Sequence, residues 1–337
     1  NLDWAMDTPK KVLRRFGFNP KVYVRFFAFP ISDEETKTLY ETAKMVKKQK
    51  ALLLVTIEPW NGLSTVTDFE AERHANIIKK AGVKTFVRFA HEMNGSWYSW
   101  CQQPTVYKTA FAKLATAIHK INGKNAAMIW APNYGGGYPF SGGQYEVKPN
   151  TPDFSVLDTN TDGVINMYDD PYEPYYPGDE FVDWVGMTLY HWGNQYPWGE
   201  NELPEEGKFA QQLTGTYNGL DGDNSMLPDF YKTYATIKNK PMAIPETSAL
   251  FVPSTGIADI EYEIKKNWWN QVFSQDSRSQ FPMIKMINWF EWRKPESEIQ
   301  GAVVDWRIGN RFDMLEEFIS VLEKAGLGVI IKKRSEK

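Results

Sequence analysis

Two glutamates stand at the ends of short apolar runs, where a parallel sheet would bring their carboxyl groups to one edge. Glu92 follows the run Thr85–Ala90, and Glu246 follows the run Pro241–Pro245. Strand alternation places Arg88 and Glu92 on the same face. Glycoside cleavage needs two carboxyl groups flanking a sugar bond, one protonated and one ionised. A structural ion pair between either glutamate and Arg88 is the alternative interpretation.

A second kind of chemistry, metal-dependent peptide cleavage, does not fit these residues. His91 and Glu92 begin a pattern like the H-E-x-x-H zinc helix, but Gly95 stands where the second histidine is required. The chain has only 4 histidines, so a histidine-rich metal site is not expected. Its one cysteine, Cys101, excludes an intramolecular disulfide and a thiolate metal cluster within the chain.

The segment Asp158–Asp169 has the spacing of a calcium loop. Oxygen-bearing side chains fall at loop positions 1, 3 and 5, a glycine at 6, a backbone carbonyl at 7 and a carboxylate at 12. The predicted ligands are Asp158, Asn160, Asp162, Val164 and Asp169. Oxygen ligands without nitrogen or sulfur suit calcium. A run of Asx turns around Gly163 is the alternative, and we expect a structural ion in this loop and not a calcium sensor.

Short apolar, β-branched runs alternate along the chain with longer amphipathic segments, which predicts a parallel sheet covered by helices. The expected strands are Val22–Phe29, Ala51–Ile57, Thr85–Ala90, Ala126–Ala131, Val182–Tyr190, Pro241–Pro245 and Ile284–Phe290. The expected helices are Ser32–Lys48, Thr67–Ala81, Thr105–Ile121 and Asp259–Phe273. Closing a barrel needs an eighth strand, and residues Asn1–Trp4 could supply its end.

These elements favour a single α/β domain over residues 1–337, a (β/α)8 TIM barrel with a C-terminal tail at 325–337. Barrel enzymes keep their active sites at the carboxyl ends of the strands, where Glu92 and Glu246 fall. The segment Gly135–Gly178 reads as a long βα loop that carries the calcium pattern. An open doubly wound sheet is the structural alternative. Its dinucleotide-binding version is disfavoured because no G-x-G-x-x-G follows the first strands.

Charge and composition exclude several classes of partner. The net charge is −4, so no basic excess is available to hold a nucleic acid backbone. No run approaches the roughly 20 apolar residues of a membrane span. Aromatic residues make up 15% of the chain, which suits either a large core or flat binding faces. We expect a monomer that needs no organic cofactor.

The segment Arg88–Trp100 resembles the strand-four signature of glycoside hydrolase family 26. Further stretches are similar to the later strands of that family, and the resemblance covers nearly the whole chain. They are Trp130-Ala131-Pro132-Asn133, Trp184-Val185-Gly186, Tyr190-His191-Trp192, Glu246 and Asn288-Trp289-Phe290-Glu291-Trp292 with Lys294. The family contains β-mannanases, β-1,3-xylanases and mixed-linkage β-glucanases.

The resemblance implies a retaining mechanism, with Glu92 as acid/base and Glu246 as nucleophile. It further implies that His91 and Asn94 contact the sugar beside the scissile bond, and that Tyr190 orients Glu246 through a hydrogen bond. Arg88 is expected to line the same site.

Four tryptophans are candidate stacking faces for sugar rings, although a core position is the alternative for each. They are Trp97, Trp130, Trp289 and Trp292, and Trp60 is a weaker candidate. Pro245 departs from the family pattern just before Glu246. Because proline removes a ladder donor and fixes φ, we expect a bulge or bend there.

The sequence therefore predicts a secreted, retaining endo-β-glycoside hydrolase that acts on a β-linked polysaccharide. β-1,4-Mannan is the leading substrate by family frequency alone, and mixed-linkage β-glucan and β-1,3-xylan remain open. A non-catalytic carbohydrate-binding protein is the rival from another class. A hydrolase using the calcium loop as its catalytic metal site is disfavoured, because the loop's own ligands would fill the ion's coordination sphere.

Overall fold

The computed structural model describes residues 2–327, and in this range the chain forms a curled sheet of parallel strands. The expected C-terminal tail lies outside the described residues from residue 328 onward. The strand order is β1 (Val22–Ala28), β2 (Leu52–Glu58), β3 (Thr85–Phe89), β4 (Ala126–Trp130), β5 (Trp184–Gly186), β8 (Met242–Thr247) and β9 (Ile284–Trp289). All seven predicted strands are present.

The position of the eighth strand is held by the first described residues. Leu2 pairs with Glu291 in a parallel bridge just beyond β9. The Trp4 indole N–H donates to the carbonyl of Val24 in β1 at 2.8 Å. These contacts confirm the expected strand end at the N-terminus. Elsewhere along this seam the described residues show no backbone pairing, and a cavity of about 540 Å³ lies between β1, β9 and the helices outside them.

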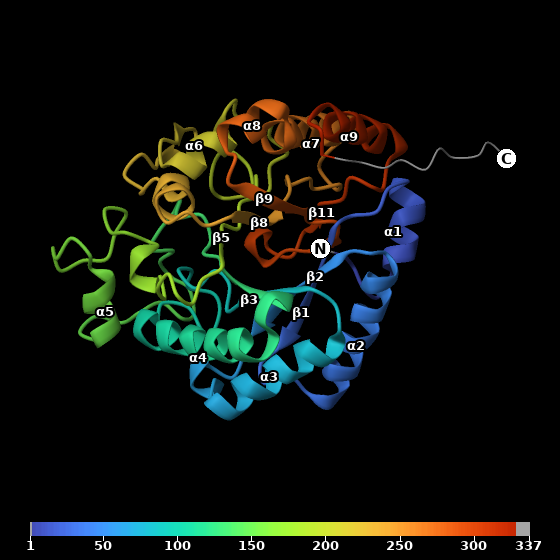
Figure 1. The fold of residues 1–337 in the computed structure, drawn as a ribbon. Helices are drawn as coiled ribbons and strands as arrows, with labels where there is room; N and C mark the ends of the chain where they lie inside the picture. Colours follow the sequence, from blue (N-terminus) through green and yellow to red (C-terminus); the bar gives the residue numbers. More distant parts are fainter. Residues whose placement is uncertain (1, 328–337) are drawn as a thin grey trace.

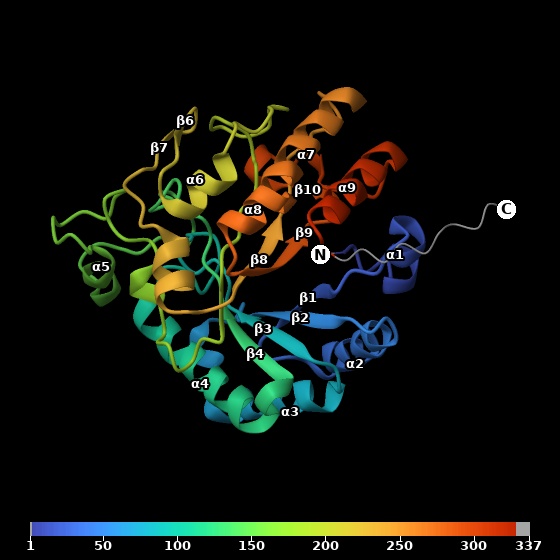
Figure 2. The ribbon, with the colours of Figure 1, turned by 45° about the horizontal axis from the view of Figure 1, so that its top comes forward.

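Helices follow the strands and cover the outside of the sheet (Figures 1 and 2). In both views α2, α3 and α4 lie outside β1–β4, and α7, α8 and α9 lie outside β8 and β9. The helices are α1 (Pro9–Phe16), α2 (Asp33–Lys48), α3 (Asp68–Ala81), α4 (Pro104–Asn122), α5 (Pro152–Leu157), α6 (Lys208–Thr214), α7 (Ala258–Phe273), α8 (Gln275–Gln280) and α9 (Phe312–Lys324), with a π-helical segment at Tyr231–Ile237. Short 3₁₀ turns lie at Leu63–Thr65, Gly123–Asn125, Glu173–Tyr175 and Ser297–Ile299.

Local sequence explains why the predicted helices begin where they do. Ser32 caps α2 through a complete capping box with Glu35, and Thr67 caps α3 by accepting the Glu70 N–H. Both side chains satisfy amides that the first helical turn leaves without a partner. Gly82 ends α3 in the left-handed conformation, as the predicted boundary requires.

Two antiparallel hairpins and a long loop extend the barrel. The hairpins are β6 (Asn218–Gly219) with β7 (Gly222–Asp223), and β10 (Arg293–Pro295) with β11 (Val303–Asp305). The loop between β4 and β5 contains α5 and projects from the barrel (green, left of Figure 1). Within the predicted long loop, Thr151 caps a short helix at Pro152–Leu157 that is too brief to show a helical period in the sequence.

The apolar residues divide into an interior set and an outer set. Inside the sheet pack Val24, Leu54, Ile129, Ala131, Ala243 and Met286. A larger cluster fills the space between the sheet and the helices. Because alternate residues of a strand face opposite sides, each strand contributes to both sets. Within the described residues, none of the helices is long and apolar enough to span a lipid bilayer.

Candidate active site

Glu246 lies in β8 at a break in the strand pairing. The register of β8 against β9 shifts between Ile244 and Thr247, which confirms the irregularity expected from Pro245. The Glu246 carboxylate is 8% exposed. It accepts a hydrogen bond from the Tyr190 hydroxyl at 2.8 Å and another from the Arg88 guanidinium. Two donors, Arg88 in β3 and Tyr190 in the segment after β5, therefore hold this carboxylate in one orientation.

Arg88 is a buried cation inside the barrel. Its side chain is fully buried, and its Nε–H donates to Thr56 Oγ1 in the neighbouring strand at 3.0 Å. Its guanidinium also lies 5.4 Å from the ring centre of Phe26. Its Nη2 donates a hydrogen bond to Glu246, whereas buried Nη1 has no hydrogen-bond partner in the described structure. The ion pair with Glu246 was the alternative interpretation of these residues, and here it forms part of the same site.

Glu92 reaches the site through a turn and not through strand alternation. β3 ends at Phe89, and Ala90 and Glu92 then take positive φ angles of 43° and 56°. Such backbone is unusual for residues other than glycine and often occurs at functional sites. The Glu92 N–H donates to the Ala131 carbonyl at 3.0 Å, and the Trp97 indole N–H donates to Glu92 Oε2 at 3.1 Å. One hydrogen bond therefore fixes the Glu92 backbone, and another fixes its carboxyl group.

The protonation of Glu92 differs from that of an ordinary glutamate. Burial is the largest effect and, together with the negative charge of Glu246, raises the pKa of Glu92 to about 7. Arg88 and the Trp97 hydrogen bond act in the opposite direction. Near neutral pH a large share of Glu92 is protonated beside a carboxylate that is held by a guanidinium. Such a pair can act as a proton donor and a nucleophile.

His91 is buried beside this pair. Burial and the charge of Arg88 hold the pKa of His91 well below its usual value, so the ring is neutral. It packs against Phe26 at 5.7 Å and Tyr98 at 5.2 Å between ring centres. Its Nδ1 has no hydrogen-bond partner in the described structure. An unpartnered buried nitrogen of this kind can serve a bound ligand or water.

Three residues predicted to contact substrate are placed elsewhere. The Asn94 amide exchanges two hydrogen bonds of 2.8 Å with the backbone of Asn133, so it joins two loops and does not face a sugar. Trp130 is fully buried among Phe230, Tyr234 and Tyr176, because it faces outward from β4. Trp289 also faces outward, toward Phe273 and Phe318 of α7 and α9.

The other predicted aromatic residues lie near the two glutamates or close to their partners. Trp97 is 37% exposed and contacts Glu92 directly. Trp292 belongs to a satellite cluster around Tyr190. The other aromatic members of this cluster are Trp192, Trp198, Phe290 and Trp306.

Residues that the sequence analysis did not assign to the site also lie there. Glu58 ends β2, two residues after inward-facing Thr56, and its charge interacts with Arg88 and Glu246. The Tyr98 hydroxyl lies within the electrostatic reach of Glu58, Glu92 and Glu246. For Glu58, the signal in the sequence was its position two residues after Thr56, which puts both side chains on the same face of β2. It becomes informative only when the inward face of β2 is known.

The predicted calcium loop closes on itself through hydrogen bonds. The Asp162 N–H lies 3.0 Å from Asp158 Oδ1 and 2.9 Å from Asn160 Oδ1, so the oxygens of loop positions 1 and 3 lie side by side. The Gly163 N–H donates to Asp158 Oδ2 at 2.9 Å. Asp169 Oδ1 instead accepts the N–H groups of residues 159 and 160. Across the described residues no group of three or more His, Cys, Asp or Glu side chains is placed to hold a metal ion.

The side-chain oxygens of Asp158 and Asn160 thus accept backbone N–H groups as in Asx turns, the alternative arrangement, and Asp169 is turned toward backbone amides. The carbonyl of Val164 receives a long hydrogen bond of 3.5 Å from the Asn166 amide. Calcium binding by this loop stays a prediction.

Comparison with known proteins gives one relative by sequence and several proteins of similar structure. No family model matches the chain. It is 24% identical over 289 residues to endoglucanase H of Acetivibrio thermocellus, across 82% of this chain and 25% of that protein. The chain therefore spans about a quarter of the length of this curated relative.

Solved structures share the fold at low sequence identity. The catalytic domain of a Bacillus sp. JAMB-750 family 26 endo-β-1,4-mannanase superposes with a TM-score of 0.53 at 15% identity, over 93% of this chain and 78% of that one. GH26C of Muricauda sp. MAR_2010_75 gives 0.53 at 14% identity, over 93% and 80%. A family 26 β-mannanase of Bacteroides ovatus gives 0.51 at 13% identity, over 97% and 87%. The chain thus has the (β/α)8 barrel fold of glycoside hydrolase family 26, the family that its strand-end residues resemble.

Proposed function

We propose that the protein is a retaining endo-β-glycoside hydrolase that cleaves a β-linked polysaccharide by double displacement. The observation that carries this proposal is the pair of Glu92 and Glu246. Desolvation raises the pKa of the first to about 7, and the second is fixed by Arg88 and Tyr190. The likeness to family 26 mannanases in fold and to an endoglucanase in sequence agrees with it.

In the first step the Glu246 carboxylate attacks the anomeric carbon while Glu92 gives its proton to the departing glycosidic oxygen. The bond to that oxygen breaks, and a glycosyl ester forms on Glu246. In the second step Glu92, now ionised, takes a proton from water, and the resulting hydroxide displaces Glu246 from the sugar. The Tyr190 hydroxyl and Arg88 hold the Glu246 oxygens in place throughout.

The substrate proposal is β-1,4-mannan, with mixed-linkage β-glucan and β-1,3-xylan as the alternatives. The mannanase names of the structural neighbours favour mannan, and the endoglucanase name of the curated relative favours a glucan. Mannose and glucose differ in the configuration at C2, so contacts to that hydroxyl are one basis for the choice between mannan and a glucan.

The test is reducing-sugar release from mannan, glucomannan, lichenan, β-1,3-xylan and laminarin, with Glu246→Ala as the control. Release from one glycan that the variant abolishes would establish the enzyme and its substrate class. If purified protein releases sugar from none of them yet binds one, the non-catalytic binding protein becomes the better account. Equal release by Glu246→Ala would contradict the assignment of the nucleophile.

We also propose that the protein acts outside the cell, where intact polysaccharide is found, and that calcium stabilises the Asp158–Asp169 loop. Asp158, Asn160 and Asp162 would hold the ion by their side-chain oxygens and Val164 by its carbonyl, with Asp169 at the last position. Treatment with a chelator should lower the melting temperature, and added calcium should restore it. Unchanged melting temperature and metal content would contradict the calcium proposal.

A further inference from the structure

Glu58 is a third carboxyl group at the mouth of the barrel. Thr56 of β2 faces inward, since its hydroxyl accepts the Nε–H of Arg88. Strand alternation places Glu58 on the same face one layer higher, at the last residue of the strand. Residues at this end of the strands form the active sites of barrel enzymes.

Glu58 interacts electrostatically with two residues of the proposed active site. Its carboxylate interacts with Arg88 and Glu246, the nucleophile of the proposed reaction. Burial raises the pKa of Glu58 to about 7, and the charge of Glu246 adds to this, while Trp60 and Arg88 oppose it. The charge of Glu58 is therefore coupled to that of the nucleophile.

The hydrogen-bonding groups around Glu58 are incompletely used. Its carboxylate accepts one hydrogen bond of 3.3 Å from the Trp60 indole N–H. Nearby Arg88 has a fully buried Nη1 without a partner in the described structure. A buried guanidinium nitrogen without a partner is costly unless a ligand or water completes it. The Glu58 carboxylate is thus available as an acceptor and Arg88 Nη1 as a donor, both near Glu246.

The surface above Glu58 suits a sugar ring. Trp60 is 49% exposed, and Ser99 fixes its backbone by donating to the Trp60 carbonyl at 2.9 Å. Its ring packs edge-on against Trp100 at 5.0 Å and Tyr98 at 5.5 Å. A carboxylate beside an exposed aromatic ring combines an orienting polar group with an apolar surface, as carbohydrate sites require.

We propose that Glu58 is a specificity-determining residue, which binds a hydroxyl group of the sugar ring that Glu246 attacks, with Arg88 Nη1 donating to the same ring. This inference rests on the proposed glycosidase function and extends it to the choice of glycan. Glu58 would select the hydroxyl configuration of that ring, because a sugar with the hydroxyl turned away forms no hydrogen bond with the half-buried carboxylate.

The test compares Glu58→Gln with the wild-type protein on the glycan panel. We expect kcat/KM on the preferred glycan to fall by about 10- to 100-fold, the size of a hydrogen bond to a charged group, and to fall less on the other glycans. Glu72→Gln, which removes an exposed carboxylate paired with Lys120, is the matched control and should leave every value unchanged. A uniform loss on all glycans, or no loss, would overturn the inference while leaving the proposed function intact.

A binding measurement keeps the two proposals separable. Calorimetric titration of the Glu246→Ala protein with manno- and cello-hexaose should give a Kd that Glu58→Gln weakens by about 10-fold for the preferred sugar only. If the wild-type protein cleaves no glycan but this selective weakening is found, the inference on Glu58 stands and the hydrolase proposal fails. If neither sugar binds, both are overturned.

Discussion

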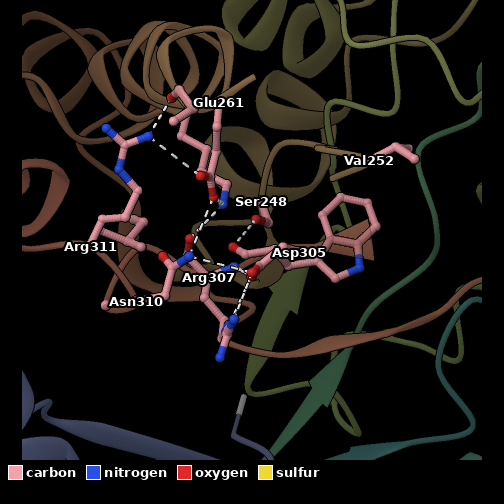
Figure 3. A network of polar contacts seen from close by, with 12 residues as sticks. Ser248, Val252, Glu261, Asp305, Arg307, Asn310 and Arg311 are labelled. Carbon is pink, nitrogen blue, oxygen red and sulfur yellow. Dashed lines mark hydrogen bonds and ion pairs between the residues drawn. The ribbon is translucent and has the colours of Figure 1, made fainter. Parts of the chain in front are cut away.

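Two regions of the molecule bury several charged side chains, and they differ in how the charges are balanced. Behind the barrel mouth, a polar network joins α7 to the segment after β11 (Figure 3). There fully buried Lys265 donates to Glu261 Oε1 and to the Arg307 carbonyl, both at 2.6 Å. The Arg307 guanidinium donates two hydrogen bonds to the Asp305 carboxylate, of 2.8 and 2.6 Å. Arg311 completes the network at 3.6 Å from Glu261.

In this network cations match the carboxylates. Burial acts to raise the pKa of Asp305. Hydrogen bonds from Arg307 and the charge of Lys265 outweigh this effect and leave the pKa below its usual value. At the barrel mouth, in contrast, Glu58, Glu92 and Glu246 interact with one cation among the described residues, Arg88, and the pKa values of Glu58 and Glu92 rise to about 7. Burial alone therefore does not mark a catalytic site. An excess of one charge in a buried place does, because it forces protons onto groups that can then transfer them.

The largest effect should come from removing the nucleophile. Glu246→Ala should lower the catalytic rate on the order of 10⁴-fold or more, since the covalent step is lost. Its melting temperature should fall, because Arg88 is left buried without its closest carboxylate. Steady-state kinetics and calorimetry check both results. A variant that keeps its rate but unfolds readily would make the mouth a structural network like the one in Figure 3.

Breaking an ion pair in the network should cost stability and leave the catalytic rate unchanged. Lys265→Met should destabilise the fold by about 3–5 kcal/mol, because it leaves Glu261 buried without its closest cation. Its kcat, measured per folded molecule, should not change. Denaturant unfolding measures the first and active-site titration the second. Lys266→Met removes a partly exposed ion pair with Glu317 and is the control, with an expected cost of about 0–1 kcal/mol.

The pH dependence of the reaction should report the proton on Glu92. Activity should fall as pH rises above about 7, because the general acid loses its proton there. In Trp97→Phe the indole hydrogen bond that lowers the pKa of Glu92 is gone, so the alkaline limb should move to higher pH. The limb is read from kcat/KM against pH. A limb that shifts downward or stays fixed would argue against this assignment of the acid.

The smallest effect concerns stability. The native pKa of Glu58 and Glu92, about 7, lies above the ordinary value of 4.5, so the folded state holds more protons than the unfolded state between these values. The stabilisation of the folded state that results from these raised pKa values is fully present below about pH 4.5 and is lost as pH rises through 7. Glu58→Gln and Glu92→Gln should each raise the melting temperature at pH 8 by about 2–5 °C, and less at pH 5. Equal shifts at both pH values would contradict the raised pKa.

The sequence predicted the sheet well because the strands of a parallel barrel are continuous apolar runs. All seven predicted strands and the four predicted helices are present, with boundaries within a few residues except at β5. That strand covers only Trp184–Gly186 of the predicted Val182–Tyr190, because apolar character continues into the turn that carries Tyr190. The hairpin of β10 and β11 was not predicted, since its short strands lack a clear alternation.

The structure brings the predicted Glu92 and Glu246 into one site, whereas it places the predicted Trp130 and Trp289 on the outer face of the sheet. A strand-end position indicates the level of a residue in the barrel, not the side to which it points. Trp130 faces the helices because its neighbours Ile129 and Ala131 fill the interior. Asn94 was misassigned for a different reason: its partner is a backbone, that of Asn133, which no residue pattern reveals.

The most direct test of the account is to trap the covalent intermediate. The protein would be incubated with a 2-deoxy-2-fluoro β-glycoside of its preferred sugar that carries a good leaving group, and the labelled peptide would be identified by mass spectrometry. We predict one glycosyl unit on Glu246, and none in Glu246→Ala. A glycan-hydrolysing protein that gives no adduct, or gives one on a different residue, would contradict the assignment of Glu92 as acid and Glu246 as nucleophile.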